Sequence, residues 1–151
     1  MPVKKLREFL DNENVKYVTI SHSTAFTAQE VAASAHIPGK EMAKTVMVKL
    51  DGKMAMAVLP ADHRIDFDLL KQEAGVSTVK LAGEEEFTCM FPECDVGAMP
   101  PFGNLYDMDV FVAGSLAENE EIAFNAGSHT ELIKLPYKDF ERLVKPKQFR
   151  S

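Results

Sequence analysis

The segment from Met42 to Ala61 constrains the fold more than any other part of the 151-residue chain. Residues 42–50 and 53–61 form two nearly continuous apolar runs, and the pair Asp51-Gly52 lies between them. An Asp-Gly link favours a tight hairpin, and long apolar runs on both sides of such a link are typical of buried strands. We therefore predict a hairpin at the centre of a sheet.

Lys44 lies where the chain enters this hairpin. A rigid strand could hold its ammonium partly withdrawn from water, where a lysine is suited to contact an anionic or carbonyl oxygen. A solvated lysine at the end of a strand is the alternative interpretation. The sequence pattern alone allows both.

The remaining segments alternate between helical and extended patterns. Helices are predicted over residues 2–14, 27–36, 67–74, 84–91 and 137–144, and further strands over 15–21, 78–82, 109–113, 121–125 and 131–135. Thr27 and Glu30 have the spacing of a capping box, while Asp66 and Gly75 are the expected caps of the helix over 67–74. These elements predict a single α+β domain, residues 1–151, with a mixed sheet of about six to seven strands surrounded by helices.

Composition excludes several classes of protein. The apolar fraction of 46% and the charged fraction of 26% are typical of a soluble globular chain. No apolar run approaches the roughly 20 residues that span a bilayer, and residues 1–6 lack the apolar stretch of a secretory signal. A net charge of −6 argues against a protein that coats nucleic acid, although Lys4, Lys5, Arg7, Lys145, Lys147 and Arg150 could form a local basic face. We expect a cytoplasmic protein that binds neither membrane nor DNA.

The side chains show no known cofactor motif. Cys89 and Cys94 have no histidine nearby, and the four histidines lack the spacing of metal ligands, so we expect structural or incidental thiols and no metal. No phosphate loop or dinucleotide fingerprint is present, and we expect no organic cofactor. A serine triad is not supported either, because there is no Gly-x-Ser-x-Gly elbow, and His22 and Ser23 would point to opposite faces of a strand.

Two later segments are candidate ligand contacts. Gly97 to Gly103 encloses Pro100-Pro101, and such a rigid loop can bring its backbone close to a ligand, although a plain connecting loop is the alternative. In Gly127-Ser128-His129, small residues precede a histidine. Backbone amides there could bind a carbonyl while the imidazole forms a hydrogen bond, although a structural histidine is the alternative.

Four segments, 22–31, 43–45, 97–103 and 124–129, occur in an order and spacing that resembles the YbaK and prolyl-tRNA synthetase-associated editing-domain family. The resemblance covers about residues 15–140. Members of that family are trans-editing enzymes, or domains inserted in prolyl-tRNA synthetase, that hydrolyse the ester of a tRNA charged with the wrong amino acid. The resemblance implies a mixed sheet that is partly rolled into an open barrel, with helices around it.

The resemblance also implies roles for individual residues. Lys44 is similar to the family's essential lysine, held near the aminoacyl ester or the terminal adenosine phosphate. Gly97 and Pro101 match a Gly-x-x-x-Pro loop that positions the substrate carbonyl and the attacking water. Gly127 and His129 match a Gly-x-His element that lines the amino-acid pocket. The expected catalytic residues are therefore Lys44, Gly97 and Pro101, and the expected substrate-binding residues are His22, Phe26, Thr45, Met99, Phe102, Gly127, Ser128 and His129.

Some positions remain open within this resemblance. Thr45 departs from the Asn or Ser that some branches place after the lysine, and Asp62 matches a frequent acidic position after the second hairpin strand. Ile20, Phe26, Met47 and Met99 are the hypothetical side chains that line the amino-acid pocket.

The sequence thus predicts a free-standing aminoacyl-tRNA deacylase. Its expected substrate carries a small amino acid, Ala, Cys, Ser or Thr, with proline tRNA as the candidate tRNA. The expected partners are the acceptor end of aminoacyl-tRNA and, as a candidate, prolyl-tRNA synthetase. A non-catalytic module that binds an aminoacyl or nucleotide-like ligand is the alternative, and an esterase or amidase for small molecules is a third hypothesis.

Overall fold

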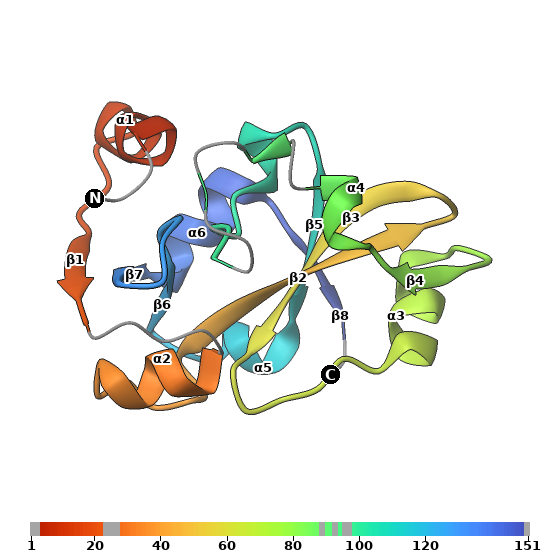
Figure 1. The fold of residues 1–151 in the computed structure, drawn as a ribbon, viewed down its shortest axis with the longest axis horizontal. Helices are drawn as coiled ribbons and strands as arrows, with labels where there is room; N and C mark the ends of the chain where they lie inside the picture. Colours follow the sequence, from red (N-terminus) through yellow and green to blue (C-terminus); the bar gives the residue numbers. More distant parts are fainter. Residues whose placement is uncertain (1–3, 23–27, 88–89, 92–93, 95–97, 150–151) are drawn as a thin grey trace.

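The computed structural model describes residues 4–22, 28–87, 90–91, 94 and 98–149 (Figure 1). Its strands are β1 (Val18–Ser21), β2 (Met42–Leu50), β3 (Lys53–Pro60), β4 (Val79–Leu81), β5 (Asp109–Ala113), β6 (Glu121–Asn125), β7 (Glu131–Pro136) and β8 (Lys147–Phe149). Its helices are α1 (Lys4–Asn12), α2 (Ala28–Ser34), α3 (Phe67–Ala74), α4 (Glu84–Phe87), α5 (Gly114–Ala117) and α6 (Tyr137–Val144), with a 3-10 turn, η2, at Gly103–Leu105.

The eight strands form one mixed sheet in the order β1-β7-β6-β2-β3-β5-β8, and β4 pairs with β2 outside this path. The sheet is open, with β1 and β8 at its two ends. This architecture confirms the predicted α+β class. In the described part of the chain, no helix has both the length and the apolarity needed to cross a membrane.

The predicted hairpin is confirmed, and Figure 1 shows β2 and β3 running through the centre of the molecule. Asp51 and Gly52 both have positive φ, 51° and 83°, as a tight two-residue turn requires. The Asp51 carboxylate also accepts hydrogen bonds from the backbone N–H groups of Ser77 and Thr78, at 2.9 and 2.8 Å. The turn therefore joins two strands and also holds the start of β4 against them.

Side-chain alternation along the central strands creates two differently packed faces. On one face, Ala43 and Phe124 join a large core with Leu6 and Leu10 of α1 and Phe140 of α6. On the other face, a smaller cluster packs α2 against the sheet through Val31, Ala32, Met42, Ala123 and Leu132. We call this second side the α2 face. It positions the candidate site described below.

Local helix signals were read correctly from the sequence. Helices α3 and α6 have the predicted limits. The Asp66 carboxylate accepts from the N–H groups of Asp68 and Leu69, at 3.0 and 3.1 Å, and Gly75 ends α3 in the left-handed conformation with φ 68°. The predicted capping threonine, Thr27, lies outside the described residues.

Several elements differ from the prediction, and three short ones differ most. A single helical turn, α5, occurs where we expected a simple turn, and α4 covers Glu84–Phe87 of the predicted range 84–91, in which residues 88–89 lie outside the described residues. Strand β8 was not predicted at all, and its three residues pair in parallel with β5 from Phe111↔Lys147 to Ala113↔Phe149. Elements of three or four residues are too short to show the hydrophobic periodicity of a helix or a strand, so the sequence pattern does not reveal them.

Candidate functional site

The side chain of Lys44 is partly buried on the α2 face of central strand β2. Burial lowers the pKa of its ammonium below the usual value, the nearby charge of Arg64 lowers it further, and the carboxylate of Asp62 partly offsets both effects. No hydrogen bond or ion pair joins this ammonium to another residue in the described ranges. Lys44 is therefore a partly desolvated cation that is available to an oxygen of a ligand.

The parallel pairing of β2 with β6 places Lys44 at the end of β6. Met42 pairs with Ala123 and Ala43 pairs with Phe124, and Lys44 and Asn125 are the residues that directly follow this last pair on the two strands. Asn125 is the last residue of β6, and the segment 126–130 follows it directly. Because side chains alternate, Lys44 and Asn125 both belong to the α2 face.

Backbone hydrogen bonds connect the other predicted segments to this same end of the sheet. The N–H of Gly127, which has a φ of 103°, donates to the carbonyl oxygen of Ala98 at 2.9 Å. The N–H of His22 donates to the carbonyl oxygen of Thr130 at 2.8 Å. These two hydrogen bonds therefore join the residue after β1 and the loop that contains Pro101 to the segment that follows β6.

The described part of the proline loop is packed firmly against the core. Pro100 and Pro101 are buried, and Met99 belongs to the large core cluster. Phe102 is fully buried, with its ring centroid 5.4 Å from that of Phe124 and 5.6 Å from that of Phe140. Its side chain supports the loop from inside the protein, so it can influence a ligand only through the position of the backbone.

The expected site residues are not all on one face. Thr45 alternates with Lys44 and therefore lies on the side of Ala43 and Met47, opposite the α2 face. Ser128 lies near Thr130, with 3.4 Å between their hydroxyl oxygens, and Ile20 packs against the α2-face cluster. Gly97 and Phe26, two of the expected site residues, lie outside the described residues.

The model of the aminoacyl-tRNA editing domain family matches residues 22–143. The chain belongs to this family. The editing domain is also 30% identical over 89 residues to the proline–tRNA ligase of Bacillus cytotoxicus and 28% identical over 89 residues to that of Bacillus mycoides. Each match covers 59% of this chain but only 16% of the ligase, so the editing domain corresponds to a small part of those relatives.

Two solved structures share the fold of this editing domain. One is the crystal structure of a hypothetical protein, with a TM-score of 0.85 and 20% identity over 96% of this chain and 97% of that one. The other is a candidate trans-editing enzyme for prolyl-tRNA synthetase, with a TM-score of 0.82 and 17% identity over 98% of this chain and 96% of that one. At these identities the likeness establishes the fold alone.

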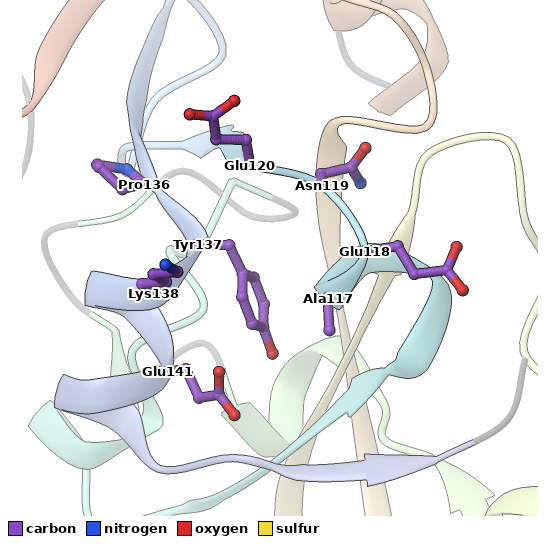
Figure 2. Close-up of a pocket in the computed structure, with 8 residues that line it drawn as sticks. All are labelled: Ala117, Glu118, Asn119, Glu120, Pro136, Tyr137, Lys138 and Glu141. Carbon is purple, nitrogen blue, oxygen red and sulfur yellow. The ribbon is translucent and has the colours of Figure 1, made fainter.

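A separate hollow of about 550 Å³ lies at the opposite end of β6 (Figure 2). Its lining consists of Ala117, Glu118, Asn119, Glu120, Pro136, Tyr137, Lys138 and Glu141. Figure 2 shows the Tyr137 ring extending between Ala117 and Glu141, and burial followed by the Glu141 charge raises the pKa of its hydroxyl to about 12. Three glutamates in this lining make the hollow unfavourable for a polyanionic ligand.

Sequence reasoning missed two residues at the Lys44 site. Arg64 was read only as part of a polar loop, yet its charge contributes to the lowered pKa of Lys44. Asn125 was read as the end of a strand and as part of the segment 124–129, without a role of its own, although a polar residue that ends an apolar run could have marked it. Among the described residues, no three His, Cys, Asp or Glu side chains gather into a metal-binding group.

Proposed function

We propose that this editing domain is a trans-editing aminoacyl-tRNA deacylase. Two observations support the proposal: Lys44 and the segment Gly127–His129 both follow the last β2–β6 pair, Ala43↔Phe124, and the N–H of Gly127 donates to Ala98 in the loop that contains Pro101. The proposed substrate is a tRNA that carries a small amino acid such as Ala, Cys, Ser or Thr, and proline tRNA is the leading candidate because the relatives include proline–tRNA ligases.

The reaction needs little from the protein beyond positioning. Water attacks the ester carbonyl carbon, the bond from that carbon to the ribose oxygen breaks, and the ribose oxygen takes up a proton, which releases amino acid and tRNA. Backbone N–H groups directed at the developing oxyanion contribute about 3 kcal/mol each. In this proposal the neighbouring ribose hydroxyl helps to activate the water, so no protein nucleophile is required.

Lys44 has the properties that this reaction requires of a cation. Its ammonium is partly withdrawn from water, which strengthens its attraction for the carbonyl oxygen or for the terminal phosphate. The rigid strand β2 holds the base of its side chain between β3 and β6. We assign Lys44 the role of binding one of these oxygens during hydrolysis.

Amino-acid selection would depend mainly on size. One methylene group is worth only about 1–3 kcal/mol in a binding pocket, so an editing site gains selectivity by excluding the larger, correct amino acid. The net charge of −6 also suggests that the protein contacts mainly the acceptor end of the tRNA. Binding should therefore weaken strongly as salt concentration rises.

The decisive experiment is a panel of tRNAs charged with Ala, Cys, Ser or Thr, with release of amino acid as the measurement. Lys44→Ala should abolish release while circular dichroism stays unchanged. Lys49→Ala is a matched control on the same strand, because Lys49 pairs with Glu86 at 2.8 Å and lies several residues from the proposed site. Failure of the wild-type protein on the whole panel, beside an active control deacylase, would refute the proposal.

A further inference from the structure

Asn125 carries a buried polar atom whose role the proposed mechanism does not explain. Its side-chain oxygen is closed to solvent and has no hydrogen-bond donor among the residues that the structure describes. A buried acceptor without a donor destabilises a fold, so a polar residue in this position calls for a physical reason. A ligand that brings its own donor would provide one.

The position of Asn125 relates it directly to Lys44. Both residues lie on the α2 face, on adjacent strands and in neighbouring register positions. The charges that act on the Lys44 ammonium belong to Asp62 and Arg64, which follow β3, whereas Asn125 lies on the β6 side of β2. An ester held at Lys44 could therefore extend toward Asn125 across the width of β2.

We infer that the side-chain oxygen of Asn125 binds the α-ammonium group of the aminoacyl ester. This inference rests on the proposed deacylase function and adds a specific contact to it. A carboxamide oxygen can only accept a hydrogen bond, so the ligand must supply an N–H or O–H group. Because this oxygen is closed to solvent and Asn125 is only 7% exposed, a ligand must displace neighbouring atoms to reach it, and a small ammonium group requires less displacement than a ribose or a nucleobase.

The ammonium is the donor that every unmodified aminoacyl ester with a primary amine shares, whatever its side chain. Contact with this group would orient the ester without selecting among Ala, Cys, Ser and Thr. The size of the pocket would then make the selection separately. Asn125 is thus inferred to be a substrate-binding residue that recognises an α-amino acid as such.

A comparison of two esters tests this contact. The first is the tRNA ester of the amino acid that the panel identifies, and the second is the same ester with hydrogen in place of the α-ammonium group. Asn125→Ala should lower kcat/KM for the first ester about 10- to 100-fold, as expected for loss of a hydrogen bond to a charged group, and by less than about 3-fold for the second. Asn125→Asp should retain activity on the first ester, because it keeps an acceptor.

Controls separate binding from folding. Asn119→Ala removes an amide that donates to the carbonyl oxygens of Lys40 and Leu116, at 2.7 and 3.1 Å, near the opposite end of β6. This variant should affect both esters equally. If Asn125→Ala does not fold, Asn125→Leu removes the acceptor while it retains most of the volume, and the same comparison applies.

The outcomes distinguish this inference from the proposed function. An equal loss on both esters would overturn the ammonium contact and leave deacylation standing, since Asn125 would then act on structure, on a bound water or on the ribose. A loss confined to seryl and threonyl esters would also overturn it, because the contact would be to the side chain. A wild-type protein inactive on every charged tRNA would overturn both ideas.

Discussion

The conformation of Gly127 makes Gly127→Ala a quantitative test of the proposed site. Its φ of 103° lies in a region that residues with a Cβ atom rarely adopt, which costs about 1–3 kcal/mol when enforced. Alanine also reduces the conformational entropy of the unfolded chain, which raises the free energy of unfolding by about 0.4–1 kcal/mol. If the segment keeps its conformation, the net loss of stability should be about 1–2 kcal/mol, or roughly 2–8 °C in Tm for a chain of this size.

The segment after β6 can relieve this strain by changing the φ of Gly127, and that change would also alter the proposed site. A change in φ would turn the N–H of Gly127 away from the carbonyl oxygen of Ala98, which accepts it at 2.9 Å. The segment after β6 would then shift relative to the proline loop. Because a displacement of about 1 Å in an active site can cost about 100-fold in rate, we expect kcat/KM for deacylation to fall about 10- to 100-fold.

Gly75→Ala is the matched control for this variant. Gly75 also has a positive φ, 68°, but it ends α3 and nothing lies within 4 Å of the Cβ atom that alanine would add. It should lose about 1 kcal/mol of stability and keep full activity. Urea unfolding and the charged-tRNA assay should be run on both variants. Wild-type stability together with wild-type deacylation in Gly127→Ala would refute the reasoning, because strain that persists must lower stability and strain that is relieved must shift the segment.

Three further predictions concern single side chains. Lys44→Met should abolish deacylation without lowering stability. The pKa of Lys44 is lower in the folded state, so the unfolded state binds the proton more tightly and the stability of the wild-type protein rises with pH between the two pKa values. Urea unfolding at pH 7 should therefore show the variant to be at least as stable as the wild-type protein. Tyr137→Phe should flatten the loss of stability that the wild-type protein shows between about pH 10 and pH 12, because the unfolded tyrosine deprotonates first; equal slopes in alkaline urea titrations would contradict this. Asp66→Ala should cost about 1 kcal/mol through loss of the α3 cap while kcat/KM stays unchanged, and a fall in kcat/KM would link α3 to the site.

The sequence predicted elements whose cause is local. The β2–β3 hairpin follows from two apolar runs around Asp51-Gly52, and α3 follows from its caps at Asp66 and Gly75. In each case, residues within a few positions of one another contain the whole physical reason. The resemblance to editing domains was also recognisable in the sequence, because its four segments occur in a fixed order.

The relation between these segments depended on long-range pairing. Parallel pairing of β2 with β6 joins positions about 80 residues apart, such as Ala43 and Phe124, and no local pattern encodes that register. The same holds for the hydrogen bond from Gly127 to Ala98 and for strand β8, whose short run pairs with β5. Residues adjacent in the chain can also be separated by the fold: Thr45 follows Lys44 directly but lies on the opposite face of the sheet.

The sequence by itself determined the α+β class and the central hairpin, and it made Lys44 the leading candidate for a functional residue. Only the tertiary structure decided what surrounds Lys44: a partly desolvated position beside Arg64 and Asp62, with Asn125 in the next strand. The physical reason is that turns and caps are set by neighbouring residues, whereas burial, electrostatic environment and strand register depend on segments that meet only when the whole chain folds.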